Sequence, residues 1–370
     1  MASVAVRKHL IFQTAFIGDL LLAIPLMKHI QHLWPEDELH LICRKGFGDF
    51  FLKTNLVDQV FELDKKSKIN TQQVLGKMEK IRYENLFCPH QSVRTALLTR
   101  KINAKNKISF HEKWNSVFFQ KRVGRQKHLP DALRQLSLLI PLDMDLSEDF
   151  ANYVGERRLP QISLPEPGTS NKDAHVPEWA SMGLRNHFLQ NAQVFDELKN
   201  KFGIQPGPYA VIAPGSVWET KRWTVEGFAA VTEETVKRGI HVLLVGTQGE
   251  RSICEQVAKK IPNTTVLAGK TSLYETTHLI AHASFVLSND SGAMHMASVA
   301  ETPTVAVFGP TVLPLGYRPW QNHAIVVERE NLSCRPCGKH GHHKCPIGTH
   351  ICMKSVLPQA VLEAIDSLKR

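Results

Sequence analysis

The 370-residue sequence has no apolar run near the ~20 residues needed to span a bilayer. The best candidate, residues 16–27, is interrupted by Asp19 and Pro25. A secretory signal is not indicated either, because the first apolar run, residues 9–12, is short and leads directly into Gln13. These absences predict a protein that stays in the cytoplasm.

Three other features are scarce or missing. Low-complexity sequence is almost absent, and a hydrophobic content of 43% indicates a folded globular chain long enough for two domains. The glycine-containing loop at 246–250 is not a GxGxxG fingerprint, which disfavours nicotinamide chemistry. Four of the seven cysteines lie in the last forty residues, so cysteine usage is local and does not indicate a disulfide framework.

Acidic residues are too few to balance the basic ones. The formal net charge is +10, which favours an anionic partner such as nucleic acid, a nucleotide or a phosphate-rich membrane surface. Basic residues gather at 65–68, 100–107 and 121–127, all in the first half. The alternative is that the charge serves solubility alone.

Strand-like and helix-like segments alternate through both halves of the chain. This alternation predicts an α/β protein with parallel sheets and helices on both faces. The pattern dissolves in a proline-rich region between Gly155 and Pro208, where we place a domain boundary. The domains expected are 1–165, a linker or insertion at 166–207, a second domain at 208–353 and a C-terminal helix at 354–370.

The most informative stretch is residues 287–311, which we interpret as strand, tight turn, helix and strand. The turn offers the Ser291 hydroxyl, Gly292 and unpaired N–H groups at the positive end of a helix, where a phosphate is well placed. His295 falls in the first helical turn beside that position. The alternative is that Asp290 or Ser291 is only an N-cap.

Two further loops follow predicted strands of the second half. In the first, residues 214–223, a diphosphate clamp is plausible because Ser216, Lys221 and Arg222 lie together, although a solvated basic loop is the alternative. In the second, Glu250 could accept hydrogen bonds from a ribose or could favour its helix N-terminus. All three loops should meet at one edge of one sheet, which favours a nucleotide site.

Asp19 lies where the first strand ends, at the edge where α/β proteins bind ligands. It could act as a general base or merely cap the helix that it precedes. Residues 143–145 imitate the DxD motif with which some sugar transferases hold a metal, but their acidic surroundings after a proline favour a turn.

The cysteine-rich tail leaves two interpretations open. Interleaved histidines make a zinc site conceivable, but the spacing lacks the paired CxxC of a zinc ribbon. Buried or redox-labile thiols are the other interpretation. The four cysteines concerned are Cys334, Cys337, Cys345 and Cys352.

Taken together, these motifs resemble glycosyltransferase family 9, the ADP-heptose:lipopolysaccharide heptosyltransferases, and within it the heptosyltransferase II type. The matching motifs are spread over almost the entire chain and occur in the same order as in the family. The matching pieces are Phe16–Asp19 with Pro25, PGSVWETKRW at 214–223, the 246–250 loop, NDSGAMHMA at 289–297 with FGPT behind it, and the CRPC tail.

The resemblance implies a GT-B fold, with two facing Rossmann-like domains and a C-terminal helix packing back across the cleft. It also implies inverting, metal-independent transfer of L-glycero-D-manno-heptose from ADP-heptose to the lipopolysaccharide inner core, with no cofactor. Asp19 would be the general base, and Lys221, assisted by Arg222, would neutralise charge on the departing ADP. The other implied donor-binding positions are Ser216, Glu250, Asp290, Ser291, Gly292 and His295.

The partners implied are the ADP-heptose donor and a phosphorylated lipid A or inner-core acceptor at the inner face of the membrane, with peripheral attachment and no nucleic acid. Two departures from the family are Thr224, where proline is common, and a long polar segment at 166–193. One alternative is a family 9 enzyme with another sugar donor or acceptor. The alternative of another class is a basic nucleic-acid-binding protein with a zinc-bound cysteine tail.

Overall fold

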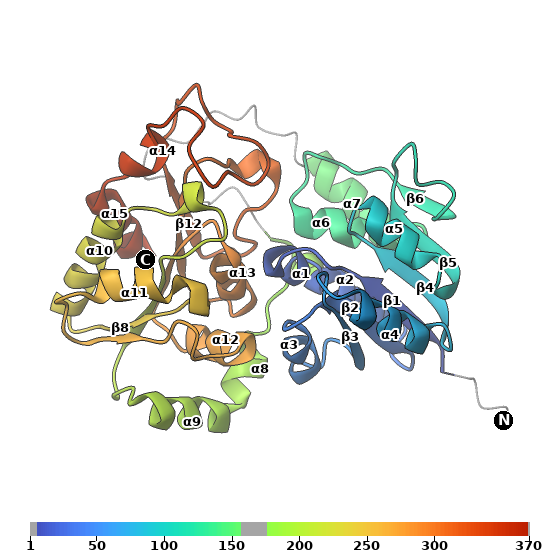
Figure 1. Cartoon of the computed structure of the whole chain (residues 1–370), viewed down its shortest axis with the longest axis horizontal. Helices are drawn as coiled ribbons and strands as arrows, with labels where there is room; N and C mark the ends of the chain where they lie inside the picture. The colour runs from blue at the N-terminus through green and yellow to red at the C-terminus, as the bar shows by residue number, and fades with distance from the viewer. Residues whose placement is uncertain (1–5, 157–175, 369–370) are drawn as a thin grey trace. The chain divides into compact units, whose positions relative to one another are not determined.

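The computed structural model describes residues 6–156 and 176–368. The chain divides into two compact units, Met1–Pro160 and Gln161–Arg370. Each unit contains one parallel six-stranded sheet with helices packed on it (Figure 1). The predicted α/β class is confirmed.

The sheet of the first unit has the strand order β3-β2-β1-β4-β5-β6. Its central strand is buried from His9 to Phe12, so helices cover both of its faces. The strands are β1 (Lys8–Phe12), β2 (Glu38–Arg44), β3 (Gln59–Leu63), β4 (Arg82–Cys88), β5 (Asn103–Phe110) and β6 (Lys121–Val123). The helices are α1 (Ile17–Leu21), α2 (Ile24–Leu33), α3 (Gly48–Lys53), α4 (Lys68–Met78), α5 (Val93–Thr99), α6 (Asp131–Leu136), the 3-10 turn η1 (Ser137–Leu139) and α7 (Met144–Glu156).

The region after β1 contains two helices where the sequence suggested one helix after a turn at Asp19. Pro25 occupies the first turn of α2, where its missing N–H costs nothing, and a break separates α1 from α2. Asp19 therefore lies inside the first turn of α1 and does not precede the helix. The DxD-like Asp143 accepts a hydrogen bond from the Leu146 N–H at the start of α7, as a turn or cap residue does.

The second sheet has the order β12-β11-β10-β7-β8-β9. Its strands are β7 (Tyr209–Ala213), β8 (His241–Leu244), β9 (Thr264–Val266), β10 (Val286–Asn289), β11 (Thr304–Phe308) and β12 (Ala324–Glu328). Its helices are α8 (Arg185–Gln190), α9 (Ala192–Phe202), α10 (Val225–Lys237), α11 (Arg251–Ala258), α12 (Leu273–Ala281), α13 (Gly292–Val299), α14 (Ile351–Lys354) and α15 (Pro358–Ser367). Short 3-10 turns are η2 (Glu178–Ala180), η3 (Glu219–Lys221), η4 (Gln248–Glu250) and η5 (Leu313–Leu315).

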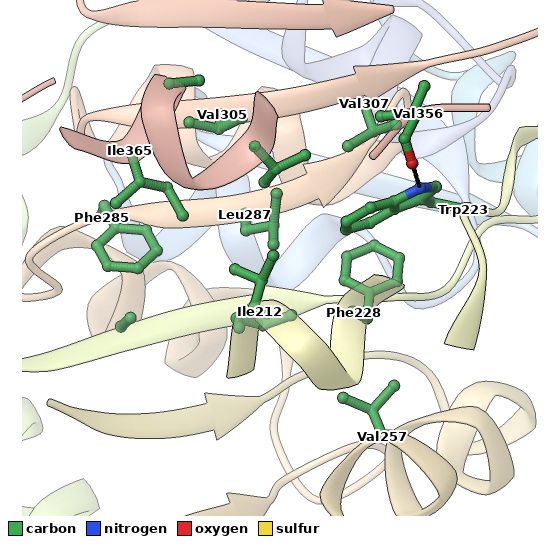
Figure 2. Packing of buried hydrophobic residues seen from close by; sticks show 14 of the residues in the cluster. Ile212, Trp223, Phe228, Val257, Phe285, Leu287, Val305, Val307, Val356 and Ile365 are labelled. Atoms are coloured by element: carbon green, nitrogen blue, oxygen red, sulfur yellow. Dashed lines mark hydrogen bonds between the residues drawn. The ribbon is translucent and has the colours of Figure 1, made fainter. Parts of the chain in front are cut away.

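The core of the second unit joins strands far apart in sequence to the C-terminal helix. Figure 2 shows Ile212, Leu287 and Val305 from neighbouring strands in one hydrophobic cluster with Ile365 of α15. Trp223 is fully buried, and its indole N–H donates to the carbonyl of Val356 at 3.0 Å. This contact ties the loop after β7 to the end of the chain.

Two segments differ from the sequence expectation. The expected C-terminal helix at 354–370 is α15, which begins only at Pro358, and Lys354 is the last residue of the separate short helix α14. Residues 185–202 of the expected linker form α8 and α9, which pack on α12 of the second unit. Residues 166–175 lie outside the described part of the chain. Thr224 caps α10 by accepting the Gly227 N–H, so it replaces a proline without loss of the helix start.

The two sheets share one connectivity. Numbered within its own unit, each sheet has the order 3-2-1-4-5-6, which reverses direction beside its first strand. In such sheets the ligand lies outside the carboxyl ends of the strands at this reversal. The positions concerned are the loops after β1 and β4 in the first unit and after β7 and β10 in the second. Among the described residues, no helix is long and apolar enough to cross a membrane.

Candidate active site

The loops after β7 and β10 are joined by one buried amide. The Asn289 side chain donates to the carbonyls of Pro214 and Gly215 at 2.9 and 3.2 Å, and it accepts the Trp223 N–H at 2.8 Å. Asn289 is wholly buried, so all of its hydrogen bonds are made to protein. This amide fixes both ends of the 214–223 loop against the end of β10.

Lys221 and Asp290 form a buried ion pair. The Lys221 Nζ lies 2.6 Å from Asp290 Oδ2, and the Thr311 hydroxyl donates to the same oxygen at 2.6 Å. Both charged side chains are at least nine-tenths buried. An ammonium has three donors, so the pairing orients Lys221 without consuming its capacity to bind an anion. Sequence reasoning placed both residues at the site but did not foresee that they pair.

The helix α13 begins beside this pair. Ser291 is its N-cap residue in an extended conformation, and its side chain makes no capping hydrogen bond. Gly292 follows at the first helical position, and His295 is buried in the first turn. The positive end of α13 and the Lys221 ammonium therefore lie near the same carboxylate, an arrangement suited to a diphosphate.

Glu250 connects the third predicted loop to the first. Its carboxylate accepts the N–H and hydroxyl of Thr247 at 2.8 and 2.9 Å, as in a capping box. The same carboxylate lies over Gly215, where a Cβ atom would come within 2.3 Å of it. Glu250 thus has the capping role left open above, and it also touches the 214–223 loop.

Arg222 has a supporting position. Its Nε donates to the carbonyl of Ser216 at 2.8 Å, which closes the loop that carries both residues. Ser216 itself is buried. The structure therefore brings Ser216, Lys221, Arg222, Glu250 and Asp290 to one edge of the second sheet.

Asp19 is held in the first unit by its own helix and by α6. Its carboxylate accepts the Phe16 N–H at 3.2 Å, and its carbonyl accepts the Gln135 side-chain N–H at 2.8 Å. Burial, followed by the charge of Asp131, raises the pKa of Asp19 from 3.8 to about 6. Asp131 accepts in turn from Arg125 and Gln135. No local sequence signal linked α6 to Asp19, which is 116 residues from Gln135.

Three cations gather near Asp19 at the same edge of the first sheet. Burial and the charges of Arg44 and Arg94 lower the pKa of Lys65, while Asp19 acts on it in the opposite direction. Arg94 donates to the Lys65 carbonyl at 3.1 Å, and Arg44 lies over the Phe16 ring at 4.9 Å. In residues 6–156, none of these three cations forms an ion pair with a carboxylate.

His90 lies beside this cluster. Burial, together with the charges of Lys65 and Arg44, lowers the pKa of His90 to about 4. The ring is therefore neutral at physiological pH. Its Nδ1 lies 2.9 Å from the Thr95 hydroxyl and 3.2 Å from that of Thr14.

The cysteine-rich tail contains free thiols. All seven cysteines of the chain are unpaired. Among the described residues there is no group of three or more His, Cys, Asp or Glu side chains placed to hold a metal ion. Backbone N–H groups around Cys345 lower the pKa of its thiol, whereas burial raises that of Cys352 to about 11.

Comparison with known proteins places the chain in a family. The model of glycosyltransferase family 9 (heptosyltransferase) matches residues 73–346. Lipooligosaccharide heptosyltransferase 2 of Campylobacter jejuni is 29% identical over 203 residues, which are 51% of this chain and 60% of that protein. The match thus spans less than two thirds of that relative. The lipopolysaccharide core heptosyltransferase OpsX of Haemophilus influenzae is 26% identical over 87% of this chain and 84% of its own length.

The fold has solved counterparts. The Escherichia coli ADP-heptose lps heptosyltransferase II aligns over 98% of both chains with a TM-score of 0.73 and 18% sequence identity. At that identity the likeness supports the predicted GT-B fold, and the match of the family model supports the assignment of family. The chain belongs to glycosyltransferase family 9, the heptosyltransferase family.

Proposed function

We propose that the protein transfers L-glycero-D-manno-heptose from ADP-heptose to the inner core of lipopolysaccharide, with inversion and without a metal ion. The acceptor is a phosphorylated lipid A or inner-core glycolipid, met at the inner face of the membrane by a peripherally attached cytoplasmic enzyme. Family membership supports the reaction class. The observation that carries the proposal is the buried Lys221–Asp290 pair beside the N-terminus of α13.

In this proposal the second unit holds the donor. The diphosphate lies at the α13 N-terminus near Ser291 and Gly292, where the helix dipole favours negative charge. Lys221 faces the oxygen on which charge grows as the sugar leaves. Because Asp290 already fixes the ammonium, little reorganisation is needed during the reaction, which is the condition for effective electrostatic stabilisation.

The first unit supplies the base. A carboxylate with a pKa of about 6 is ionised at neutral pH and is a stronger base than an ordinary aspartate. Asp19 takes the proton of the acceptor hydroxyl as that oxygen forms its bond to the anomeric carbon. The bond from that carbon to the ADP oxygen breaks, and ADP leaves with the electron pair. Attack opposite to the leaving group inverts the anomeric centre.

The acceptor is recognised as an anion. Arg44, Lys65 and Arg94 lie near the base without carboxylate partners of their own within the described residues of the first unit. The phosphate groups of a phosphorylated sugar core supply the negatively charged partners that these three cations lack. The same cations account for attraction to an anionic membrane surface.

The test follows ADP release from ADP-heptose with a heptosylated lipid A core acceptor, in EDTA. Wild type should release ADP only when the acceptor is present, and Asp19→Ala should lose this release while ADP still binds. Asp49→Ala is a matched control, because Asp49 lies exposed in the first turn of α3, where its charge favours the helix and pairs with the exposed Lys53.

Each outcome bears on one part of the proposal. Release from another nucleotide sugar but not from ADP-heptose would assign a different donor within the family. Activity that EDTA abolishes would refute metal independence. If Asp19→Ala stays as active as Asp49→Ala, then Asp19 is only a helix-capping residue and the base lies elsewhere.

A further inference from the structure

The segment from Cys334 to His350, named here the His/Cys segment, lies against the loop that carries Lys221. Thr220 and His342 are joined in both directions. The Thr220 N–H and hydroxyl donate to the His342 carbonyl at 3.1 and 2.8 Å, and the His342 N–H donates to the Thr220 hydroxyl at 2.8 Å. One residue before Lys221, the backbone is thus fixed by the His/Cys segment.

His350 completes this attachment. Its Nε2 lies 2.8 Å from the Thr220 carbonyl, and because a carbonyl only accepts, Nε2 carries the proton. His350 has a left-handed backbone, with φ of 50°, and its N–H donates to the Cys345 sulfur at 3.3 Å. The turn that presents His350 is therefore organised by Cys345. All three polar groups of Thr220 are bonded to the His/Cys segment.

The same segment also contacts the other neighbour of the ion pair. The Cys337 N–H donates to the Pro310 carbonyl at 2.8 Å, and the Arg335 guanidinium donates to the Thr311 carbonyl at 2.7 Å. The Thr311 hydroxyl bonds the Asp290 oxygen that Lys221 also contacts. The segment therefore bonds to both loops that set the geometry of the pair.

Gly341 shows how closely these parts fit. Its φ of +79° is in the left-handed region, and a Cβ atom there would lie 3.0 Å from the Thr220 hydroxyl and 3.2 Å from Pro310. The same atom would lie 3.4 Å from the Lys221 Cγ. A side chain at this position would push on the Thr220 hydroxyl and on the Pro310 ring, while the distance to the Lys221 stem is an ordinary contact. The backbone of the segment thus approaches Thr220, the residue before Lys221, so closely that a glycine is favoured here.

We propose that the His/Cys segment positions the Lys221 ammonium for the donor diphosphate, with His350 as a positioning residue that acts through Thr220. This proposal rests on the function proposed above. Lys221 belongs to η3, which is three residues long and has little rigidity of its own. A displacement of ~1 Å at a charge that stabilises a leaving group can cost ~10²-fold in rate.

The test compares His350→Ala with His350→Gln in steady-state transfer from ADP-heptose. The glutamine amide can donate to Thr220 as the imidazole does, whereas alanine cannot. His350→Ala should lower kcat ~10-fold or more with a smaller change in the donor KM, because Lys221 acts on charge that develops in the transition state. His350→Gln should recover most of kcat. If His350 had a purely structural role, His350→Ala would lower the melting temperature without lowering kcat more than it changes the donor KM.

Three further variants test the interpretation. His323→Ala removes an exposed histidine before β12 and should leave kcat unchanged. If His350→Ala does not fold, Thr220→Val and Thr220→Ser replace it, because valine keeps the shape and loses the hydroxyl, while serine keeps the hydroxyl. Loss of kcat in Thr220→Val with retention of kcat in Thr220→Ser supports positioning of Lys221 by the His/Cys segment through its His342 contact, and equal kcat in both variants overturns it.

The proposal is overturned if folded His350→Ala matches wild type, or if the alanine and glutamine variants are equally impaired. Failure of the heptosyltransferase proposal is recognised separately, as wild type that binds ADP but releases it from no donor with any acceptor. ADP affinity measured by calorimetry then decides the positioning proposal. Weaker binding in His350→Ala that is restored in His350→Gln supports it, and unchanged binding refutes it. Wild type that binds no ADP refutes both.

Discussion

Asp19 should make the folded protein less stable at neutral pH than a neutral side chain at that position would. The pKa of Asp19 is about 6 in the folded protein, against an ordinary value of 3.8, so the folded state binds the proton more tightly than the unfolded state does. The stability that this tighter proton binding provides is fully present below pH 3.8 and is lost as the pH rises through about 6. The difference corresponds to ~3 kcal/mol, since each pH unit is worth ~1.4 kcal/mol.

Asp19→Asn is the perturbation that isolates this charge. An amide keeps the shape of the protonated carboxyl and can accept the Phe16 N–H. The free energy of unfolding should therefore exceed that of wild type by up to ~3 kcal/mol at pH 7.5, and by only ~1 kcal/mol at pH 4.5. Urea unfolding followed by circular dichroism at the two pH values measures both differences.

The comparison variant is Asp49→Asn, at the exposed aspartate paired with Lys53 in α3. Its unfolding free energy should stay within ~0.5 kcal/mol of wild type at both pH values. If Asp19→Asn were destabilising at pH 7.5, or if its gain were the same at both pH values, the assignment of a raised pKa to Asp19 would be refuted. A variant that is more stable and yet inactive would mark Asp19 as a residue kept for chemistry.

Three other predictions test the site. Because the carboxylate of Asp131 adds to burial in raising the pKa of Asp19, Asp131→Asn should shift the acidic limb of the pH profile of kcat/KM from about pH 6 toward pH 3.8. An acidic limb that does not shift would contradict this role of Asp131. Arg94→Ala should raise the KM of the phosphorylated acceptor several-fold and leave the donor KM unchanged, and the difference should shrink in high salt. Gly215→Ala should displace the Glu250 carboxylate and weaken ADP binding, measured by calorimetry. An affinity for ADP equal to that of wild type would contradict this prediction.

The sequence was sufficient for features set by local pattern. Alternating strand and helix segments predicted the doubly wound sheets, and strand ends predicted which loops would meet at the carboxyl edge of the second sheet. The break between α1 and α2 was missed because the apolar period continues through it, although Pro25 was a usable signal. Strand β12 was missed because its short run, 324–328, lies beyond a long irregular segment.

Contacts between distant residues could not be read from local pattern. The pairing of Lys221 with Asp290 spans 69 residues, and the bond from Gln135 to Asp19 spans 116. The first depends on strand order, which brings the loops after β7 and β10 together, and the second depends on the packing of α6 against the helices after β1. The tail was ambiguous for the same reason, since its contacts with Thr220 are invisible in its own spacing.

The bond from Trp223 to Val356 has a consequence for synthesis of the protein on the ribosome. The two residues are 133 positions apart, and the hydrophobic core around Trp223 includes Val361 and Ile365 near the end of the chain. At roughly 5–20 residues per second, Trp223 emerges ~7–27 s before its partner is made. The first unit can complete its sheet while the second is still being translated. The nascent second unit therefore exposes an unfinished core for many seconds, which makes it the part of the chain on which holding chaperones are expected to act.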